Sequence, residues 1–349
     1  MRSLLRLTPL FSRLMSRLGG DSHYKSHARR SWVIHPEERN NTPSAIFQPD
    51  ELHRISGTSS DDTLESELWR ARGGASTHRA TTAYELSDVV LSGGQAFTHK
   101  VHHAIASQRA PIFPRRMIRE FDHAVLASTS YGIRYFGHWM ADDLPLLMAA
   151  REIGEPVSLL TAPSPGQAGY IAALGVGSEA VSDAYFKRLV LIDDVGQHGY
   201  KRARFGRLRQ LAAPHGLPST PAGVMLLRGT SGLSRILVNE DEVTAVARER
   251  GFSVLDPVRA SAAELLRACS GAKVVIGVEG SHLTNGMLWM SERGTMVVIQ
   301  PPNRFNMVLK DWADCIGIRF AFVVGEAAEA GSFRANIGAL NRMLDAISA

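Results

Sequence analysis

Residues 273–281 read KVVIGVEGS, an uninterrupted apolar run that ends in a glycine-containing turn. A short run of this kind is typical of a strand that is buried on both faces in a parallel sheet. A helix through about Trp289 is expected to follow. Outward from this stretch, strands and helices alternate between a predicted strand at 223–227 and a closing helix at 332–347. The alternation predicts an α/β fold with a parallel sheet covered by helices on both faces.

Strand and helix patterns also precede this domain. Residues 86–91 and 157–161 are predicted strands, and residues 135–151 are a predicted helix in which Pro145 is the one discordant residue. Four turn formers between residues 214 and 221 are typical of a domain linker. The predicted parts are an amphipathic N-terminal segment (1–18), an irregular extension (19–82), an N-terminal domain (83–215), a C-terminal domain (222–330) and a closing helix (331–349).

Composition narrows the class of protein. The chain has 349 residues, of which 44% are hydrophobic and 21% charged. No apolar run approaches the roughly 18 to 20 residues that a membrane-spanning helix needs, which excludes a polytopic membrane protein. Two cysteines, Cys269 and Cys315, are too few for a disulfide framework or a cysteine zinc site, so a reducing compartment is expected. The net charge of +5 suits anionic ligands or surfaces without identifying one.

Residues 1–18 combine arginines with an apolar side and contain no acidic residue. At about 100° per residue the arginines fall within a narrow arc of a helix. They are Arg2, Arg6, Arg13 and Arg17. The pattern is typical of a helix on an anionic membrane surface or of an organelle transit peptide, although Pro9 is expected to weaken the helix in its middle. A tail that packs on the body of the protein or stays disordered is the third interpretation.

Three clusters could carry chemistry, and the first is the turn after the strand at 273–278. Amides of Ser281, His282 and Leu283 would open the next helix there and suit a phosphate. Glycines at such a place equally serve a tight turn alone. The glycines are Gly277, Gly280 and Gly286. The pattern is neither GxGxxG nor a Walker A lysine loop, which disfavours dinucleotide oxidoreductases and P-loop enzymes.

The second cluster, at residues 131–145, places His138 four residues before Asp142. The two share one helical face and can form a hydrogen-bonded pair that moves a proton. Asp143 points about 100° away from Asp142. A helix cap and a solvated face explain the same residues without any chemistry.

The third cluster begins at Arg228, seven residues before Arg235, and continues with Asn239 and Glu240. A guanidinium at the end of an apolar strand can grip a diphosphate through its planar fork. A surface ion pair with Glu240 or Glu242 explains the same arginine.

In order and spacing, the three clusters resemble glycosyltransferase family 61 over roughly residues 131–324. The family's His-Trp-x-x-Asp-acid-Leu-Pro motif reads HWMADDLP at 138–145, its Arg, Arg and Asn-Glu positions fall on 228, 235 and 239–240, and its glycine-rich Leu-Thr-Asn segment reads GVEGSHLTN at 277–285.

One departure lies in the last motif, where Glu279 stands in place of the family's His and Ser281 in place of its Ala. A carboxylate beside a diphosphate would repel it. Glu279 is therefore expected to face a ribose, the sugar or the acceptor, and His282 is an alternative hydrogen-bond donor.

The resemblance implies a GT-B-like enzyme with two Rossmann-like domains that face each other across a cleft, the donor being held mainly by the C-terminal domain. Members are inverting transferases, often UDP-dependent, and bacterial relatives act in capsular or other surface polysaccharide assembly. The implied donor-binding residues are Arg228, Arg235, Asn239, Glu240, Glu279, Gly280, Ser281, His282 and Asn285.

Within the first motif, Asp142 is the expected base for the acceptor hydroxyl, with His138 as its orienting partner or an alternative base and Asp143 as the third candidate. The chain contains no Asp-x-Asp triplet, and neither a metal nor another cofactor is expected. The expected partners are a nucleotide-sugar and a glycan or lipid-linked acceptor. The expected location is cytoplasmic and peripheral at the inner face of the membrane, through residues 1–18.

Two further function classes rest on single features. A non-catalytic, membrane-associated assembly protein of a polysaccharide machine is the alternative function, because the altered motif at Glu279 could accompany lost turnover. Nucleic-acid binding would rest on one basic segment without a recognised module, so no nucleic-acid partner is expected. That segment contains Lys201, Arg202, Arg204, Arg207 and Arg209.

Overall fold

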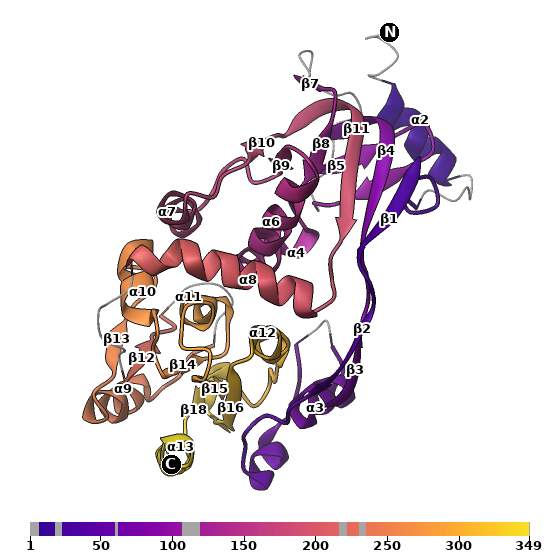
Figure 1. Ribbon diagram of the computed structural model, residues 1–349. Helices are drawn as coiled ribbons and strands as arrows, with labels where there is room; N and C mark the ends of the chain where they lie inside the picture. Colours follow the sequence, from indigo (N-terminus) through magenta and orange to yellow (C-terminus); the bar gives the residue numbers. More distant parts are fainter. Residues whose placement is uncertain are drawn as a thin grey trace. The chain divides into compact units, whose positions relative to one another are not determined.

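The computed structural model describes residues 7–17, 23–59, 62–106, 119–215, 222–229 and 235–348, which fold into two compact units (Figure 1). Unit 1 comprises Met1–Glu38, His78–Ser164 and Gly177–Gly196, and unit 2 comprises Arg39–Thr77, Pro165–Val176 and Gln197–Ala349. These units differ from the expected domains, because residues 39–77, 165–176 and 197–215 pack with the C-terminal part of the chain. Most of the expected linker, residues 216–221, lies outside the described residues.

Unit 1 is built on a mixed sheet, so the expectation of a parallel sheet is wrong here. In the described residues the strand order is β10-β9-β8-β11-β4-β5-β6, with β1 paired to β4 and β7 paired to β11. β4 runs antiparallel to β1, β5 and β11, whereas β8 runs parallel to β9 and β11. The strands are β1 (Arg30–His35), β4 (Thr81–Ser92), β5 (Gln95–Phe97), β6 (His102–Ala104), β7 (Arg119–Phe121), β8 (Ala124–Leu126), β9 (Pro156–Ser158), β10 (Glu179–Ala180) and β11 (Asp183–Asp193).

A tight turn explains the antiparallel start of this sheet. Ser92 at the end of β4 pairs with Gln95 at the start of β5, which leaves only Gly93 and Gly94 between the strands. Both glycines have positive φ, 55° and 71°, the backbone that two-residue hairpins favour. A connection this short cannot carry the crossover that parallel neighbours need.

The helix expected over 135–151 is interrupted. It is divided into α5 (Phe136–His138), a π-helical turn η2 (Trp139–Asp143) and α6 (Leu144–Ile153), and α4 (Ser130–Arg134) precedes them. Pro145 has no N–H for the carbonyl of Ala141. It is tolerated because it falls in the first turn of α6, where a missing donor costs little.

Unit 2 contains the expected parallel sheet, whose five strands follow the order β13-β12-β14-β15-β16 in the described residues. All neighbouring strands run parallel. Every residue of β12, β14 and β15 is buried, as the apolar runs predict. The strands are β12 (Gly223–Leu226), β13 (Ser253–Leu255), β14 (Val274–Val278), β15 (Thr295–Gln300) and β16 (Arg319–Val324).

Helices cover both faces of this sheet. α9 (Glu240–Glu249) and α13 (Ile337–Ser348) share one hydrophobic core with it, and α10 (Ala262–Cys269) and α12 (Val308–Ile316) contact β12 and β16. Further helices of unit 2 are α7 (Pro165–Leu174), α8 (Gly199–Ala212), η3 (Ala213–His215) and η5 (Glu329–Gly331). Two short strands, β17 (Glu326–Ala327) and β18 (Phe333–Arg334), pair with each other.

The helix expected after β14 is much shorter than predicted. It consists of a 3-10 turn η4 (Ser281–Leu283) and α11 (Thr284–Met287). The amide of Leu283 already donates to the carbonyl of Gly280. Fewer backbone amides of this turn are therefore available to an anion than the sequence predicted.

Strand order in unit 2 reverses between β12 and β14, because β13 lies on one side of β12 and the later strands lie on the other. In open parallel sheets, ligands bind outside the carboxyl ends of the strands at such a reversal. These ends are followed by Arg228 on one strand and by Glu279 on the next. The edge of the sheet at which the topology predicts ligand binding is thus formed by segments that belong to the sequence motifs.

The extension expected to be irregular is partly regular and belongs mainly to unit 2. Its elements are β2 (Glu38–Thr42), η1 (Pro49–Arg54), α3 (Leu64–Arg72) and β3 (Gly74–His78). Thr63 caps α3 by accepting a hydrogen bond from the amide of Ser66. Ile46 pairs with Ala321 of β16.

The N-terminal segment contains helix α2 (Thr8–Arg17), and residues 1–6 and 18 lie outside the described residues. Pro9 falls in the first turn, where proline is tolerated, so the expected weakening in mid-helix is wrong. The hydroxyl of Ser12 donates to the carbonyl of Val101, whereas Leu10 and Phe11 are exposed. Among the described helices, none combines the length and the apolar character that crossing a membrane requires.

Candidate functional site

Arg228 lies just beyond β12, beside the reversal of strand order. Its backbone amide donates to Glu240, with 3.1 Å between the amide nitrogen and Oε1. The side chain is buried, and its Nη1 lies 3.2 Å from Nδ1 of His282. Arginine can only donate, so Nδ1 is the acceptor and the imidazole is neutral.

The electrostatics agree with this assignment. Burial, followed by the charges of Arg228 and Arg235, lowers the pKa of His282 to about 3. A neutral imidazole orients Arg228 without adding to the positive charge. His282 therefore positions the guanidinium of Arg228.

Glu279 is the substituted residue of the glycine-rich motif, and its carboxylate lies among arginines. Oε2 of Glu279 is 3.0 Å from Nε of Arg235, whose Nη1 also donates to the carbonyl oxygen of Glu279. Burial raises the pKa of Glu279, and the charges of Arg235, Arg304 and Arg228 oppose that rise. The arginines offset the repulsion that a carboxylate alone would exert on a diphosphate.

The cluster carries more positive than negative charge. Burial, together with the charges of Arg235 and Arg304, lowers the pKa of Arg228 to about 10, and only the charge of Glu279 acts in the opposite direction. Burial likewise lowers the pKa of Arg235. Partly desolvated guanidinium groups that repel one another suit an anionic ligand, which would relieve the repulsion.

Gly280 makes room for this cluster. Its φ is 150°, a conformation that L side chains rarely adopt. A Cβ there would overlap Nη1 of Arg228 and lie 2.8 Å from Nη1 of Arg235. Arg228 and Arg235 can therefore occupy these positions only because residue 280 has no side chain.

Other residues implied in donor binding have structural partners. The side-chain amide of Asn239, which directly precedes α9, donates to the carbonyl of Ala335 and accepts from its N–H, and it does not cap the helix. The amide of Asn285 donates to the carbonyl of His282, and the carbonyl of Ser281 accepts from Thr284. These residues shape the loop, while Arg228, Arg235, Glu279 and His282 form the charged cluster.

A second candidate site lies in unit 1. Nδ1 of His138 is 2.8 Å from Oδ2 of Asp142, so the spacing correctly predicted a hydrogen-bonded pair. About a fifth of each side chain is exposed, 23% for His138 and 20% for Asp142, which leaves the pair accessible to a substrate. The ring of His138 also lies 5.0 Å from that of Tyr131 and 6.0 Å from that of Tyr135, centroid to centroid.

Asp143 has a different environment. It is buried, and its Oδ1 accepts hydrogen bonds from both the amide and the hydroxyl of Thr129, at 3.0 and 2.7 Å. A Cβ at Gly132 would overlap its carboxylate. These contacts join α4 to the π-helical turn, so Asp143 has a structural role.

The two motif regions now have both a fold and a geometry. Residues 136–298 match the family model described as Glycosyltransferase 61. This segment belongs to glycosyltransferase family 61. The family consists of glycosyltransferases, so the chain is an enzyme of that class. A comparison with curated proteins found no match.

The sequence motifs missed Arg304, which lies outside the segment matched to glycosyltransferase family 61. Its charge acts on Arg228, Arg235 and Glu279. A signal for it existed, because Arg304 follows the predicted strand at 295–299 and carboxyl ends of parallel strands meet at one sheet edge.

Replacing Gly280 tests the arrangement of the arginines. In Gly280→Ala the added methyl group should displace the guanidinium of Arg228 and weaken binding of a nucleoside diphosphate by about tenfold or more. Isothermal titration calorimetry measures the change. Gly251→Ala is the matched control, since Gly251 has a φ of 74° but nothing within 4 Å of an added Cβ. Equal losses in both variants would show that backbone strain alone is responsible.

The pH dependence of stability tests the neutral state of His282. Its folded-state pKa, about 3, lies below the unfolded value of about 6.5, so stability present above pH 6.5 is lost as pH falls towards 3. Between pH 7 and pH 5, His282→Asn should therefore lose about 2 kcal/mol less unfolding free energy than the wild type. Urea unfolding at the two pH values checks this. Parallel losses would contradict a buried neutral imidazole.

Proposed function

We propose that this glycosyltransferase 61 enzyme moves a sugar from a nucleotide-sugar donor, UDP-linked by family resemblance, to a glycan or lipid-linked acceptor in surface polysaccharide assembly. The single observation that carries the proposal is the buried arginine cluster at the strand-order reversal of unit 2. A diphosphate leaving group needs this kind of cationic environment when no metal balances its charge. The proposed reaction is a single displacement with inversion at the anomeric carbon.

In this mechanism Arg228 binds the donor diphosphate and stabilises the charge that develops as the sugar departs. Its fork can donate two parallel hydrogen bonds to phosphate oxygens, and Glu240 and His282 hold its backbone and head group. Arg235 remains paired to Glu279 and adds positive potential. We propose no metal or other cofactor for this step.

The acceptor hydroxyl requires a base, and we propose the pair of His138 and Asp142. Asp142 is the proton acceptor in this assignment and His138 orients its carboxylate, since an aspartate is ionised at neutral pH. Their 2.8 Å contact also permits the reverse assignment, with His138 as the base. Asp143 is not proposed, because Thr129 occupies its carboxylate.

We also propose a GT-B-like enzyme, because the proposed donor-binding and acceptor-binding residues belong to different units. We also propose that the N-terminal segment docks on an anionic membrane at the cytoplasmic face. The exposure of Leu10 and Phe11 on α2 supports that part of the proposal.

Arg228→Lys tests the donor site. The substitution keeps the charge but removes the fork, so turnover should fall by about tenfold or more. A thermal-shift screen of nucleotide-sugars first identifies the donor, since a ligand at about 100 times its dissociation constant adds about 2.7 kcal/mol of stability. Release of free nucleoside diphosphate then measures turnover. Exposed Arg293, ahead of β15, provides the control Arg293→Lys, and equal turnover in the two variants would refute the assignment.

The base is tested by comparing Asp142→Asn, His138→Ala and Asp143→Asn. General-base catalysis contributes about 10² to 10⁴ in rate, so Asp142→Asn should lose that much turnover with little change in donor affinity. Asp143→Asn should instead lower the melting temperature, because a neutral amide oxygen accepts the two hydrogen bonds from Thr129 more weakly than a carboxylate does. If Asp142→Asn stays within about threefold of the wild type while His138→Ala is inactive, His138 is the base.

A further inference from the structure

Arg304 lies on the loop 301–307 that follows β15. The carboxyl end of β15 lies beside that of β14, since Val278 pairs with Ile299 and the amide of Glu279 donates to the carbonyl of Ile299 at 3.0 Å. The loop therefore leaves the sheet at the edge where Glu279 and Gly280 lie. This topology brings Arg304 to the charged cluster from a third strand.

The charge of Arg304 acts on the whole cluster. Its positive charge lowers the pKa of Arg228 and of Arg235, and it favours the ionised form of Glu279. Its Nε is buried and makes no hydrogen bond to any described residue. The carboxylate of Glu279 thus interacts with the charges of three arginines.

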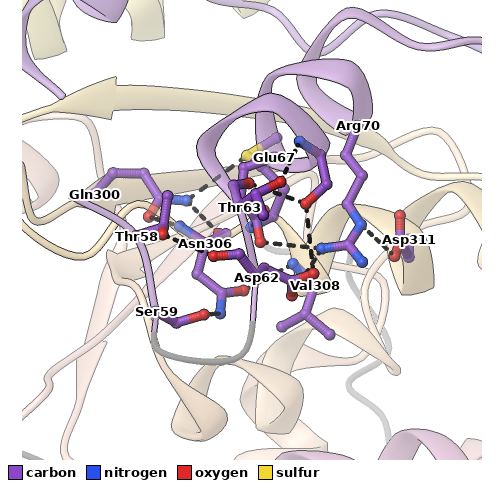
Figure 2. Close-up of polar contacts among 12 residues, drawn as sticks. Thr58, Ser59, Asp62, Thr63, Glu67, Arg70, Gln300, Asn306, Val308 and Asp311 are labelled. Carbon is purple, nitrogen blue, oxygen red and sulfur yellow. Dashed lines mark hydrogen bonds and ion pairs between the residues drawn. The ribbon is translucent and has the colours of Figure 1, made fainter.

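The loop that carries Arg304 is fastened by residues 56–59 of the extension. The amides of Ser56 and Gly57 donate to the carbonyl of Pro302, and the amide of Phe305 donates back to the carbonyl of Gly57 at 2.9 Å. Ser59 accepts a 3.0 Å hydrogen bond from the side-chain amide of Asn306. Figure 2 shows the contact between Ser59 and Asn306. Hydrogen bonds on both sides of Arg304 therefore hold its backbone.

Glu67 of α3 provides a further attachment, to the end of the loop. Its side chain is fully buried, and Oε2 accepts a 2.6 Å hydrogen bond from the amide of Met307. Its other oxygen accepts from Arg70, which also bonds Asp62 and pairs with Asp311 on α12 (Figure 2). A buried carboxylate that bonds a loop amide is costly unless these partners are all present.

We propose that Arg304 is a third arm of the donor-diphosphate site and that Glu67 is its positioning residue, acting through the loop 301–307. The inference rests on the proposed donor function and extends it to residues outside the segment that the family model matches. It gives the N-terminal extension a role in donor binding. The ligand chemistry is that of a diphosphate, with two or more negative charges that Arg228 and Arg304 contact from the ends of β12 and β15, the strands on either side of β14.

The first experiment compares Arg304→Gln with Arg293→Gln, using the full chain. The control removes the same charge at the opposite end of β15, where Arg293 is exposed. Calorimetric titration with UDP should show affinity about tenfold lower in Arg304→Gln and within about twofold of wild type in Arg293→Gln. Inorganic pyrophosphate should give the same ranking, since the arginine recognises the phosphates. Equal affinities in the two variants overturn the inference.

The second experiment tests whether Glu67 acts through Arg304. Glu67→Gln should weaken UDP binding by several-fold in the wild-type background and have no further effect in Arg304→Gln, a coupling that a double-mutant cycle measures. A purely structural loss at Glu67 would lower affinity equally in both backgrounds and would overturn its positioning role. Ser59→Ala, which removes only the hydrogen bond from Asn306, replaces Glu67→Gln in the cycle if that variant does not fold.

Wild-type binding separates this inference from the function on which it rests. If the wild type binds no nucleoside diphosphate from a uridine, guanosine and thymidine series and no pyrophosphate, the proposed donor site is overturned, and Arg304 with it. If the wild type binds UDP and Arg228→Lys weakens it while Arg304→Gln does not, the donor site stands and only the role of Arg304 is overturned.

Discussion

The buried carboxylate of Glu279 is the interaction on which the arginine cluster depends. It lies 3.0 Å from Nε of Arg235, and without it three guanidinium groups would share a poorly solvated space with no negative charge among them. The surrounding geometry follows from accommodating this pair. Gly280 must lack a side chain, and His282 must remain neutral so that it can accept from Arg228. The family's usual histidine at position 279 would supply no such negative charge.

Sequence periodicity predicted the fold best where burial alone determines the structure. The strands of unit 2 are apolar along their whole length because both faces are covered, and that pattern is readable without any knowledge of partners. The sheet of unit 1 was misjudged, since the hairpin glycines at 93 and 94 decide strand direction and were not recognised as a turn. Helix α3 was missed as well, because Glu67 and Arg70 stabilise it through contacts with residues that are more than 200 positions away in the sequence.

The same distinction applies to the site. The pairing of His138 with Asp142 was predictable, since residues four apart on a helix are neighbours whatever the rest of the chain does. Asn239 shows the opposite case. It directly precedes α9, yet its side-chain amide bonds the backbone of Ala335, 96 residues away in the chain, a contact that no local pattern in the sequence indicates. Arg304 could not be found by motif, because only the parallel register of β14 and β15 brings its loop to Glu279.

The basic segment of α8 shows why net charge identified no partner. Lys201 and Arg204 are buried, and Arg202 and Arg209 donate to the carbonyls of Cys315 and Leu288. Arg202 and Arg209 therefore connect α8 to other segments of unit 2, whereas nucleic-acid binding requires basic side chains gathered on an open surface. The arginines around Glu279 differ from those of α8, because their charges repel one another as well as interact with Glu279. Mutual repulsion among partly buried cations is tolerated in a fold when a ligand relieves it, and for this reason we propose the cluster as the donor site.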